Sequence, residues 1–467
     1  MAFLVGGANS ASGAYEIDNS LRVNGDLHHL SLIFDSAETS ANQKKFTFSC
    51  WIKLGNSPQM ATTVKKAILE STDAASSTDS IGYGHPAAAK FFYYQGAGNK
   101  KFSTTAVYRD PSAWYNLVIA VDTTDGTAND RVKMWVNGIS QTLIQSNGAL
   151  VEDSETNFGN AGDDITATSP DSGNFIHNVN TYYNSYENDR NIDGYFADLN
   201  FHSGVVGTHL NFGEFNDNGV WIPKAPTLAY NAYSYRLEFK QTGTSANASG
   251  IGADTSGSTN HFAIGQGSGT AALDVTTDTP TNNFATMNSI ASIATLSEGN
   301  CKAVTTGGER MAGASTIGMA NGKWYMEYKI TDINSINVIV GVDNDAGLSF
   351  SDFRDNDDFW NAANTYAYQS SGTKRSTGVD ASYGNSYTTG DIIGIALDMD
   401  NRKLYFSKNG TFQNSGDPTT GATGTGSAFD LTAGYTYFFQ AADQDSSSGF
   451  TVEANFGNPS FSISSGN

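Results

Sequence analysis

Residues 390–410 read GDIIGIALDMDNRKLYFSKNG. Apolar side chains recur at every second position from Ile393 to Met399, and a second alternating run follows a short polar break. Asn409 and Gly410 then form a dipeptide that favours a tight turn. Period-two alternation, a turn and a second alternating run are typical of an antiparallel hairpin with one buried face. This stretch therefore predicts β architecture.

Strand-like runs of the same kind occur along most of the 467-residue chain. In the block 15–206 they are FTFSCWIKLG (46–55), AILES (67–71), KFFYYQG (90–96), WYNLVIAVD (114–122), RVKMWVNG (131–138) and IDGYFADLNFHSGVV (192–206). In the block 301–467 the further runs are GKWYMEYKI (322–330), NVIVGVDN (337–344), YTYFFQAAD (435–443) and FTVEANFGNPSF (450–461). Many strands joined by turns indicate sandwiches of two antiparallel sheets. The predicted fold class is all-β, with one sandwich in each block.

The segment between the two blocks, 207–300, differs in composition. It begins with aromatic runs that contain Trp221 and Phe239, and it then becomes rich in Gly, Ser and Thr. Stretches of that second kind are typical of connectors, whereas the two aromatic residues indicate some packing against neighbours. The predicted division is an N-terminal arm (1–14), a sandwich (15–206), a middle segment (207–300) and a second sandwich (301–467).

Composition fits this fold and argues against several partners. The 49 Gly against 9 Pro suit a β-protein with many turns. The net charge of −21, from 26 basic and 47 acidic residues, disfavours nucleic acid, which requires clustered Lys and Arg. Anionic membranes are disfavoured for the same reason, and no apolar run approaches the roughly 20 residues of a spanning helix. We expect no nucleic-acid partner and no membrane insertion.

The two cysteines and the N-terminus bear on the compartment. Cys50 lies in a strand-like run and is expected to be a small core residue. Two thiols far apart in sequence, Cys50 and Cys301, do not form a disulfide framework, which favours folding in a reducing compartment. The N-terminal run MAFLVGGANSASG lacks the basic region and the longer apolar region of a signal peptide. Synthesis in a cytosol is expected.

Four landmarks of the second block occur in order: GKWYMEYKI, VIVGVDN, GDIIGIALDMDNRKLYFSKNG and NFGNPSF. With them the block resembles a SPRY (B30.2-type) domain over nearly its full length. In the first block, WYNLVIAVD, RVKMWVNG and DGYFADLNFHSGVV resemble the laminin-G-like and concanavalin A-like lectin/glucanase superfamily. Both resemblances imply jelly-roll-like antiparallel sandwiches that bind glycans or protein loops at the rim of the sheets. Neither implies a reaction.

Two further stretches are similar to virion proteins of marine tailed bacteriophages: residues 1–25, MAFLVGGANSASGAYEIDNSLRVNG, and residues 274–288, DVTTDTPTNNFATMN. This resemblance implies a non-enzymatic virion protein of the tail fibre or adhesin type, made in the host cytoplasm. Its expected partners are other virion proteins, further copies of itself in a homo-oligomer, and a host-surface glycan or protein. Two alternatives stay open, a purely structural head or tail decoration and a glycan depolymerase.

A depolymerase of the lectin/glucanase type would need two carboxylates on one face of a strand, with their carboxyl groups about 5 Å apart for a retaining reaction. Four candidate glutamates, Glu70, Glu238, Glu327 and Glu453, each stand without a second acid two residues away. Asp193 and Asp198 are five positions apart, which places them on opposite faces if the strand is continuous. The sequence therefore predicts that the protein is not an enzyme.

Ligand contacts are expected on loops, because sugar sites combine an aromatic platform with amide and carboxylate hydrogen-bonding groups. The run SFSDFRDNDDFWNAANTYAYQ (349–369) corresponds, in the SPRY resemblance, to a variable loop on the binding face. Its candidate residues are Phe353, Arg354, Trp360, Tyr366 and Tyr368. A weaker candidate is SIGYGHP (80–86), with Tyr83 and His85. The alternative is that residues such as Trp360 and Tyr366 pack beneath the loop.

Calcium is the one cofactor for which the sequence offers ligands. The seven histidines form no cluster with the spacing of a zinc site. The laminin-G-like resemblance implies a calcium ion at the sheet rim, for which two loops supply Asp73, Asp79, Asp125 and Asp130. In the second block, Asp343 and Asp345 offer similar oxygen ligands. The alternative is that these aspartates only stabilise turns.

Overall fold

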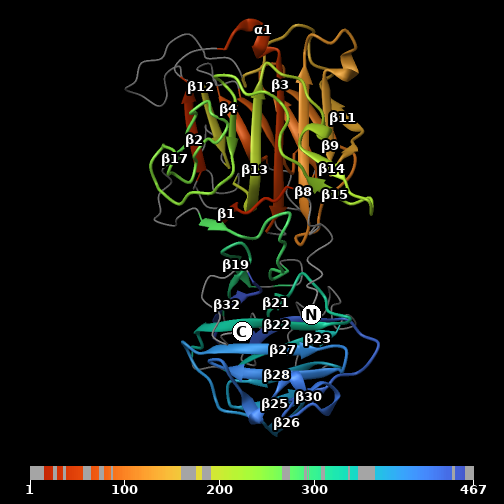
Figure 1. The fold of residues 1–467 in the computed structure, drawn as a ribbon, viewed down its shortest axis with the longest axis vertical. Helices are drawn as coiled ribbons and strands as arrows, with labels where there is room; N and C mark the ends of the chain where they lie inside the picture. The colour runs from red at the N-terminus through yellow and green to blue at the C-terminus, as the bar shows by residue number, and fades with distance from the viewer. Residues whose placement is uncertain are drawn as a thin grey trace. The chain divides into compact units, whose positions relative to one another are not determined.

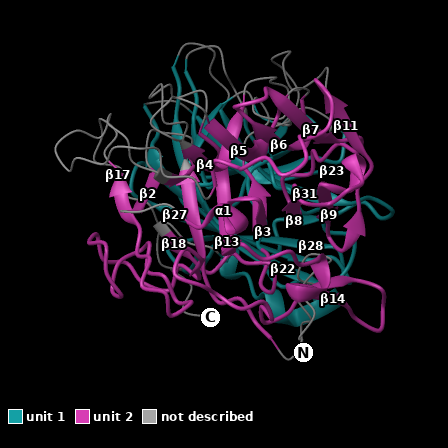
Figure 2. Cartoon of the chain, turned by 90° about the horizontal axis from the view of Figure 1, so that it is seen from above, with its two compact units in different colours: residues 1–5, 284–467 teal, residues 6–283 magenta. Residues whose placement is uncertain are grey.

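The computed structural model describes residues 15–24, 29–34, 38–55, 65–72, 78–85, 88–158, 175–180, 191–265, 274–288, 292, 294–306, 311–334, 337–344, 363–443 and 448–457 (Figure 1). The chain divides into two compact units, which Figure 2 colours separately. Unit 2 comprises residues 6–283, and unit 1 comprises residues 284–467 together with 1–5. In both units the described elements are almost all antiparallel strands, which confirms the predicted fold class.

Unit 2 contains two large antiparallel sheets. The first, sheet A, has the order β10 (Ile139–Ser140), β9 (Val132–Val136), β8 (Trp114–Asp122), β3 (Lys45–Leu54), β13 (Asp193–Ser203), β1 (Ser20–Asn24) and β18 (Asp274–Thr276), and β16 (Tyr235–Leu237) also pairs with β13. The second, sheet B, has the order β11 (Leu143–Ser146), β7 (Lys100–Thr104), β6 (Phe91–Gln95), β5 (Thr78–Tyr83), β4 (Lys66–Thr72), β12 (Phe175–Val179), β2 (His29–Phe34) and β17 (Ala263–Gly265).

Smaller elements complete unit 2. They are the helix α1 (Ser40–Gln43), the short 3-10 helices η1 (Ala128–Asp130) and η2 (His209–Asn211), and a separate hairpin of β14 (Gly213–Phe215) and β15 (Trp221–Pro223). None of the helices in the described part of the chain has the length and hydropathy needed to cross a membrane.

The core between the two sheets of unit 2 is aromatic and contains one buried histidine. The His177 ring lies edge-on to Phe201 at 4.9 Å, and to Phe34 and Phe158 at 5.4 Å each. Its Nδ1 lies 2.8 Å from the hydroxyl oxygen of Tyr235. Burial lowers the pKa of His177 to about 3, since the apolar surroundings disfavour the charged imidazolium. His177 is therefore a neutral core residue at physiological pH.

Much of the predicted middle segment is part of unit 2. Strands β16, β17 and β18, all from this segment, pair with β13, β2 and β1. Trp221 and Phe239 are 4% and 1% exposed, so the expectation that they pack against neighbours is confirmed. The contact-based boundary lies between residues 283 and 284, which differs from the predicted sandwich limit at residue 206.

A buried ion pair fixes the end of this segment on sheet A. Lys53 Nζ lies 2.8 Å from Asp278 Oδ2, and the two side chains are 1% and 0% exposed. The same ammonium donates to Asn283 Oδ1 at 2.8 Å, and Trp114 Nε1 donates to Asp278 Oδ1 at 3.1 Å. A polar, glycine-rich segment has few apolar side chains to bury, so these bonds supply the specific contacts that its composition does not.

Unit 1 also contains two antiparallel sheets. One has the order β19 (Thr295–Ser297), β20 (Lys302–Val304), β32 (Thr451–Asn455), β22 (Lys323–Asp332), β27 (Ile392–Asp398), β28 (Lys403–Lys408) and β29 (Thr411–Phe412), with β30 (Phe429–Asp430) also paired to β28. The other has the order β21 (Met311–Ala314), β31 (Tyr437–Asp443), β23 (Val338–Asn344), β24 (Tyr366–Gln369), β25 (Thr373–Ser376) and β26 (Val379–Ser382). Two 3-10 helices, η4 (Gln413–Ser415) and η5 (Pro418–Thr423), follow β29.

The hairpin predicted from residues 390–410 is confirmed in unit 1. Strands β27 and β28 pair with Ile395 opposite Phe406 and Leu397 opposite Leu404. These four side chains are at most 1% exposed, so they form one buried face. The dipeptide at 409–410 has positive φ at both positions, +48° and +81°, as a two-residue hairpin turn requires.

The cysteines are free thiols. Cys50 lies in β3 and Cys301 lies between β19 and β20, and both are buried. Burial raises the pKa of the Cys50 thiol well above its ordinary value. Cys50 is 0% exposed, which confirms the prediction of a small core residue.

Replacement of Lys53 is expected to destabilise unit 2 strongly. In a Lys53→Met variant the Asp278 carboxylate would remain buried without its cation, and breaking a buried pair in this way costs about 3–5 kcal/mol. The matched control is Lys44→Met, because the Lys44–Asp153 pair is partly exposed at 24% and 63%. Such a surface pair contributes at most about 1 kcal/mol. Urea unfolding of the full chain measures the loss of stability in each variant. Equal losses would contradict a dominant role of the Lys53–Asp278 pair.

The stability of unit 2 is expected to fall at acid pH because of His177. Its pKa is about 3 when folded and near 6.5 in an unfolded chain. The unfolded state therefore binds more protons between these values, so the contribution is fully present above pH ~6.5 and is lost as the pH falls towards 3. The loss from pH 7 to pH 4 is roughly 3 kcal/mol, at about 1.4 kcal/mol per pH unit.

Urea unfolding of the wild type, His177→Phe and His85→Gln at several pH values tests this expectation. The phenylalanine ring retains the aromatic packing and removes the titrating group, so it should flatten the acid limb. The substitution of the half-exposed His85 is the control. An unchanged acid limb in His177→Phe would show that another group causes the loss.

Candidate functional site

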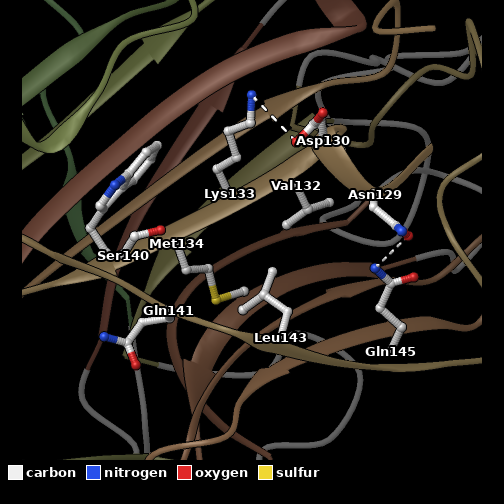
Figure 3. A pocket seen from close by; sticks show the side chains of 10 residues that line it. Asn129, Asp130, Val132, Lys133, Met134, Ser140, Gln141, Leu143 and Gln145 are labelled. Atoms are coloured by element: carbon white, nitrogen blue, oxygen red, sulfur yellow. Dashed lines mark hydrogen bonds and ion pairs between the residues drawn. The ribbon is translucent and has the colours of Figure 1, made fainter. Parts of the chain in front are cut away.

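A hollow of about 380 Å³ opens at one edge of unit 2 (Figure 3). Strand β9 lies beside the short terminal strand of sheet A, and β11 is the terminal strand of sheet B. The hollow therefore lies where the sandwich is open between its two sheets. Its lining residues are Asn129, Asp130, Val132, Lys133, Met134, Trp135, Ser140, Gln141, Leu143 and Gln145.

The floor of the hollow is apolar. Val132 and Met134 occupy alternate positions of β9 and are 4% and 1% exposed. Leu143 approaches them from β11 and is half-buried. Figure 3 shows the three side chains grouped together. They belong to the inward faces of the two sheets, so the floor is the edge of the core left open at this point.

Polar side chains surround this floor. Gln145 Nε2 donates to Asn129 Oδ1 at 3.3 Å, which uses one hydrogen of one amide and the carbonyl of the other. Gln145 Oε1 and the two N–H groups of Asn129 remain able to bond a ligand. On the outer lip, Lys133 Nζ lies 3.9 Å from Asp130 Oδ1, and both side chains are exposed.

Gln141 holds the wall opposite the amide pair. Its Oε1 accepts from the hydroxyl of Tyr108 at 2.8 Å, and its Nε2 donates to the carbonyl of Ile139 at 2.9 Å. Its backbone N–H also donates to the Met134 carbonyl at 2.9 Å. Burial raises the pKa of Tyr108 to about 12, so its hydroxyl remains a donor. The turn between β10 and β11 is thus fixed before any ligand arrives.

An aromatic run continues from the hollow over the outer side of sheet A. Trp135 lies 5.4 Å from His209, His209 lies 5.4 Å from Trp221, and Trp221 lies 5.0 Å from Phe215. The Asn-Gly turn after β9 makes this packing possible, because a Cβ on Gly138 would lie 2.3 Å from the Trp221 ring. Burial lowers the pKa of His209, which favours the neutral imidazole between the two indoles.

The outer face of sheet B carries a row of polar side chains that ends on β11, the strand whose inward face lines the hollow. The strand registers align, in order across the sheet, Ser31, Asn178, Glu70, Ser80, Tyr94, Lys101 and Ser146. Ser31 Oγ donates to Asn178 Oδ1 at 2.6 Å, and Ser80 Oγ donates to Glu70 Oε2 at 3.1 Å. The middle of the row is buried, whereas Tyr94, Lys101 and Ser146 are half-buried. The β6–β7–β11 end is therefore partly accessible, and so is Ser31 at the other end of the row.

The residues predicted for the loop in unit 1 are separated by the structure. Phe353, Arg354 and Trp360 lie outside the described residues. Tyr366 and Tyr368 lie on β24 and are 8% and 0% exposed.

The two tyrosines of β24 make core contacts. The Tyr366 ring packs 5.2 Å from Phe429, and its hydroxyl lies 3.0 Å from Thr432 Oγ1. The Tyr368 hydroxyl donates to the carbonyl of Asn385. Their rings therefore pack in the core of unit 1. For Tyr366 this agrees with the alternative prediction that it packs beneath the loop.

In unit 2, the predicted pair Tyr83 and His85 has two different environments. Tyr83 is fully buried, and its hydroxyl donates to the Tyr108 carbonyl. His85 is half-buried, and its ring lies 6.2 Å from Tyr94. Lys65 Nζ lies 4.3 Å from the centre of the same tyrosine ring. Tyr83 is thus a core residue, whereas His85 lies beside the accessible end of the polar row.

The aspartates considered for calcium are distributed over several roles. Asp79 is 0% exposed, and its carboxylate accepts bonds from Tyr93 Oη, Gly96 N and Asn157 N, each at 3.1 Å. Asp125 Oδ1 accepts from the N–H of Thr127 at 2.8 Å in a turn, and Asp130 belongs to the outer lip of the hollow. Asp73 lies outside the described residues.

In unit 1, Asp343 is 3% exposed, and burial raises its pKa to about 7. Asp345 lies outside the described residues. Within the described ranges, no group of three or more His, Cys, Asp or Glu side chains is arranged to hold a metal ion. A calcium ion stays a prediction.

Asp193 and Asp198 were predicted to lie on opposite faces if their strand is regular, and that condition is not met. Strand β13 has a bulge between Ala197 and Asn200, and Asp198 lies there with a φ of +44°. The extra residue breaks the simple alternation of faces. The separation of five positions therefore does not by itself place Asp193 and Asp198 on opposite faces.

Two acids do meet in unit 2, through an arginine. Arg236 Nε lies 2.7 Å from Asp198 Oδ1, and Arg236 Nη2 lies 3.3 Å from Glu238 Oε1. Burial raises the pKa of Asp198 despite this cation. Burial also acts to raise the pKa of Glu238, but Arg236 and Lys240 outweigh it and hold the pKa below its ordinary value. The guanidinium binds both carboxylates, so the arrangement is an ion-pair network.

Sequence reasoning missed the amides of the hollow. Gln145 and Leu143 alternate on the inward face of β11, where the pattern calls for apolar residues. A glutamine at such a position was the available signal. No such signal marked Asn129. It meets Gln145 only because the chain passes from β9 in sheet A to β11 in sheet B.

Comparisons with known proteins give weak structural likenesses and one family match. No curated protein matches the chain. Among solved structures, the SPRY domain of human HERC1 is similar with 20% identity and a TM-score of 0.24, covering 33% of this chain and 81% of that one. A putative carbohydrate binding protein from Bacteroides ovatus is similar with 12% identity and a TM-score of 0.33, covering 56% of this chain and 60% of that one.

The SAP-like pentraxin of Limulus polyphemus is similar with 14% identity and a TM-score of 0.28, covering 42% of this chain and 80% of that one. These likenesses say nothing about ligands. The family model of the SPRY domain matches residues 323–429, which run from β22 to β30. Unit 1 of this chain thus contains a SPRY domain.

Proposed function

We propose that the protein is a non-catalytic adhesin-type component of a virion, which holds a glycan or protein on the surface of a bacterial host. In this proposal the edge hollow of unit 2 is a contact site. The SPRY domain of unit 1 supports a binding role for that unit. The observation that carries the proposal is the combination, in one hollow, of an apolar floor with an amide rim.

The chemistry of the hollow favours holding a ligand over cutting it. Sugar hydroxyls and peptide groups are bound by neutral donors and acceptors placed around a small apolar surface. Among the ten lining residues, Asp130 is the single carboxylate, and its nearest cation is Lys133. Glycoside hydrolysis by the common route needs two carboxyl groups flanking the scissile bond.

The assignment to a virion rests on the resemblance of residues 1–25 and 274–288 to phage virion proteins. Copies arranged as a homo-oligomer on a particle would bind a repetitive host surface at several sites together. Linked sites raise the overall affinity without any new contact. A single hollow of this size is therefore sufficient even when each site binds weakly.

One observation favours the structural alternative, a head or tail decoration. Leu210 and Phe215 are 55% and 47% exposed and lie on the adjoining elements η2 and β14. Val206, immediately before η2, is 44% exposed. Exposed apolar side chains that lie near each other mark surfaces that pack against proteins. This surface suits the other virion proteins as partners.

Loss of the amide pair is expected to weaken attachment. The full chain is applied to a glycan array and to host cells, together with an Asn129→Ala, Gln145→Ala double variant. Loss of two neutral hydrogen bonds corresponds to roughly a tenfold or greater weakening. The control is Ile144→Gln, which alters the neighbouring exposed residue of β11 outside the hollow. No binding of the wild type at millimolar sugar, and none to host cells, would refute the adhesin function.

Incorporation into particles separates the adhesin from the decoration. A Leu210→Ser, Phe215→Ser double variant should lower the amount of protein in purified particles if this surface packs against virion proteins. The amide variant should be incorporated normally and should reduce only host attachment. Mass spectrometry of purified particles measures both. Absence of the wild-type protein from particles would contradict both virion functions.

A further inference from the structure

The hollow of unit 2 has a more specific chemistry than a general sugar site. We propose that it binds the acetamido group of a neutral N-acetylated amino sugar, an inference that rests on the proposed function of the same site. The methyl group would contact the floor, and the amide of the sugar would bond the amide rim.

The size of the apolar floor is the first argument. It consists of three side chains, Val132, Met134 and Leu143, and two of them are almost completely buried at 4% and 1% exposure. Only a small part of each faces the hollow. A floor of this kind accommodates a methyl group, whereas a longer hydrocarbon chain would extend over the polar lip. The thioether of Met134 adapts readily to such a small group.

The amide rim supplies the second argument. An acetamido group has one N–H donor and one carbonyl acceptor, so it needs an acceptor and a donor close together. Gln145 Oε1 can accept from the N–H, and the Asn129 amide can donate to the carbonyl. The 3.3 Å bond between the two side chains holds them together. A plain hexose has a hydroxyl at that position and no methyl group to cover the floor.

The rigidity of the surroundings is the third argument. Gln141 is tied by its amide to the Tyr108 hydroxyl and the Ile139 carbonyl, at 2.8 Å and 2.9 Å. Its backbone is bonded to Met134 of the floor. Little side-chain freedom is therefore lost on this wall when a ligand binds, and a preorganised site loses less free energy on binding.

Charge disfavours acidic sugars through the field of the whole chain. On the lip of the hollow Asp130 is paired with Lys133 at 3.9 Å, so these two charges offset each other locally. The net charge of −21 repels uronic and sialic acids at longer range.

The test compares two probes that differ only in the acetamido group. Methyl glycosides of N-acetylglucosamine and of glucose are titrated into the full chain, and binding is measured by saturation-transfer NMR and calorimetry. We expect the N-acetylated probe to bind at least about tenfold more tightly, because it gains the amide bonds and the methyl contact. Saturation transfer should be strongest at its acetyl methyl protons.

Variants locate the effect. Gln145→Leu retains the size of the side chain and removes one amide, so it should lower the affinity for the N-acetylated probe and narrow its difference from that for glucose, while the Asn129 donor and the methyl contact remain. Ile144→Gln should leave both affinities unchanged. Near-ultraviolet circular dichroism confirms that each variant is folded.

The outcomes distinguish this inference from the proposed function. Equal binding of the two probes, lost together in the Asn129→Ala, Gln145→Ala variant, would refute the acetamido assignment and leave the adhesin function standing. Attachment to host cells that neither probe inhibits and that the variants retain would refute the hollow as the site. No binding to any glycan or host surface would refute both.

Discussion

Unit 2 depends on the buried ion pair between Lys53 and Asp278. Removing two charges from water costs several kcal/mol per ion, and the cost is offset only where further bonds satisfy both groups. Here Asn283 accepts from the ammonium, and the Trp114 indole donates to the carboxylate. Both side chains are 1% exposed or less, so removal of one charge would leave the other buried without a counter-ion. The pair therefore specifies one position for a segment that hydrophobic burial alone would not order.

The edge hollow is a consequence of how two sheets close over one core. Inward side chains of sheets A and B pack against each other in the middle, around His177 and its aromatic neighbours. Near the edge strands β10 and β11 the two sheets end, and Val132, Met134 and the half-buried Leu143 line the hollow there. Polar residues of η1 and β11 cover the exposed margin instead. The site proposed at this edge would use core residues that the fold requires in any case, and its specificity would come from a few amides.

The two units show which structural features the alternation of apolar and polar residues can predict. In unit 1 the hairpin 392–408 was predictable strand by strand, because each apolar residue contacts a partner only a few positions away. The burial of Cys50 in β3 followed from the same pattern. The same pattern did not predict which face of the sheet Asp198 lies on, because a bulge in β13 shifts the alternation of faces by one residue. The tyrosines of β24 were equally ambiguous, since an aromatic residue after a loop suits either a ligand site or a core.

The sequence by itself determined the strands, their turns and the all-β class, because alternation and Asn-Gly turns act over a few residues. The net charge of −21 likewise follows from the sequence alone. Tertiary structure decided the boundary at residue 283, the burial of Tyr83 and Tyr368, and the meeting of Asn129 with Gln145. The boundary reflects pairings such as β17 with β2, which join residues more than two hundred positions apart, whereas Asn129 and Gln145 are 16 positions apart and meet across the hollow. Local propensity carries no information about such partners, because the free energy of each contact depends on which distant residues the fold brings beside it.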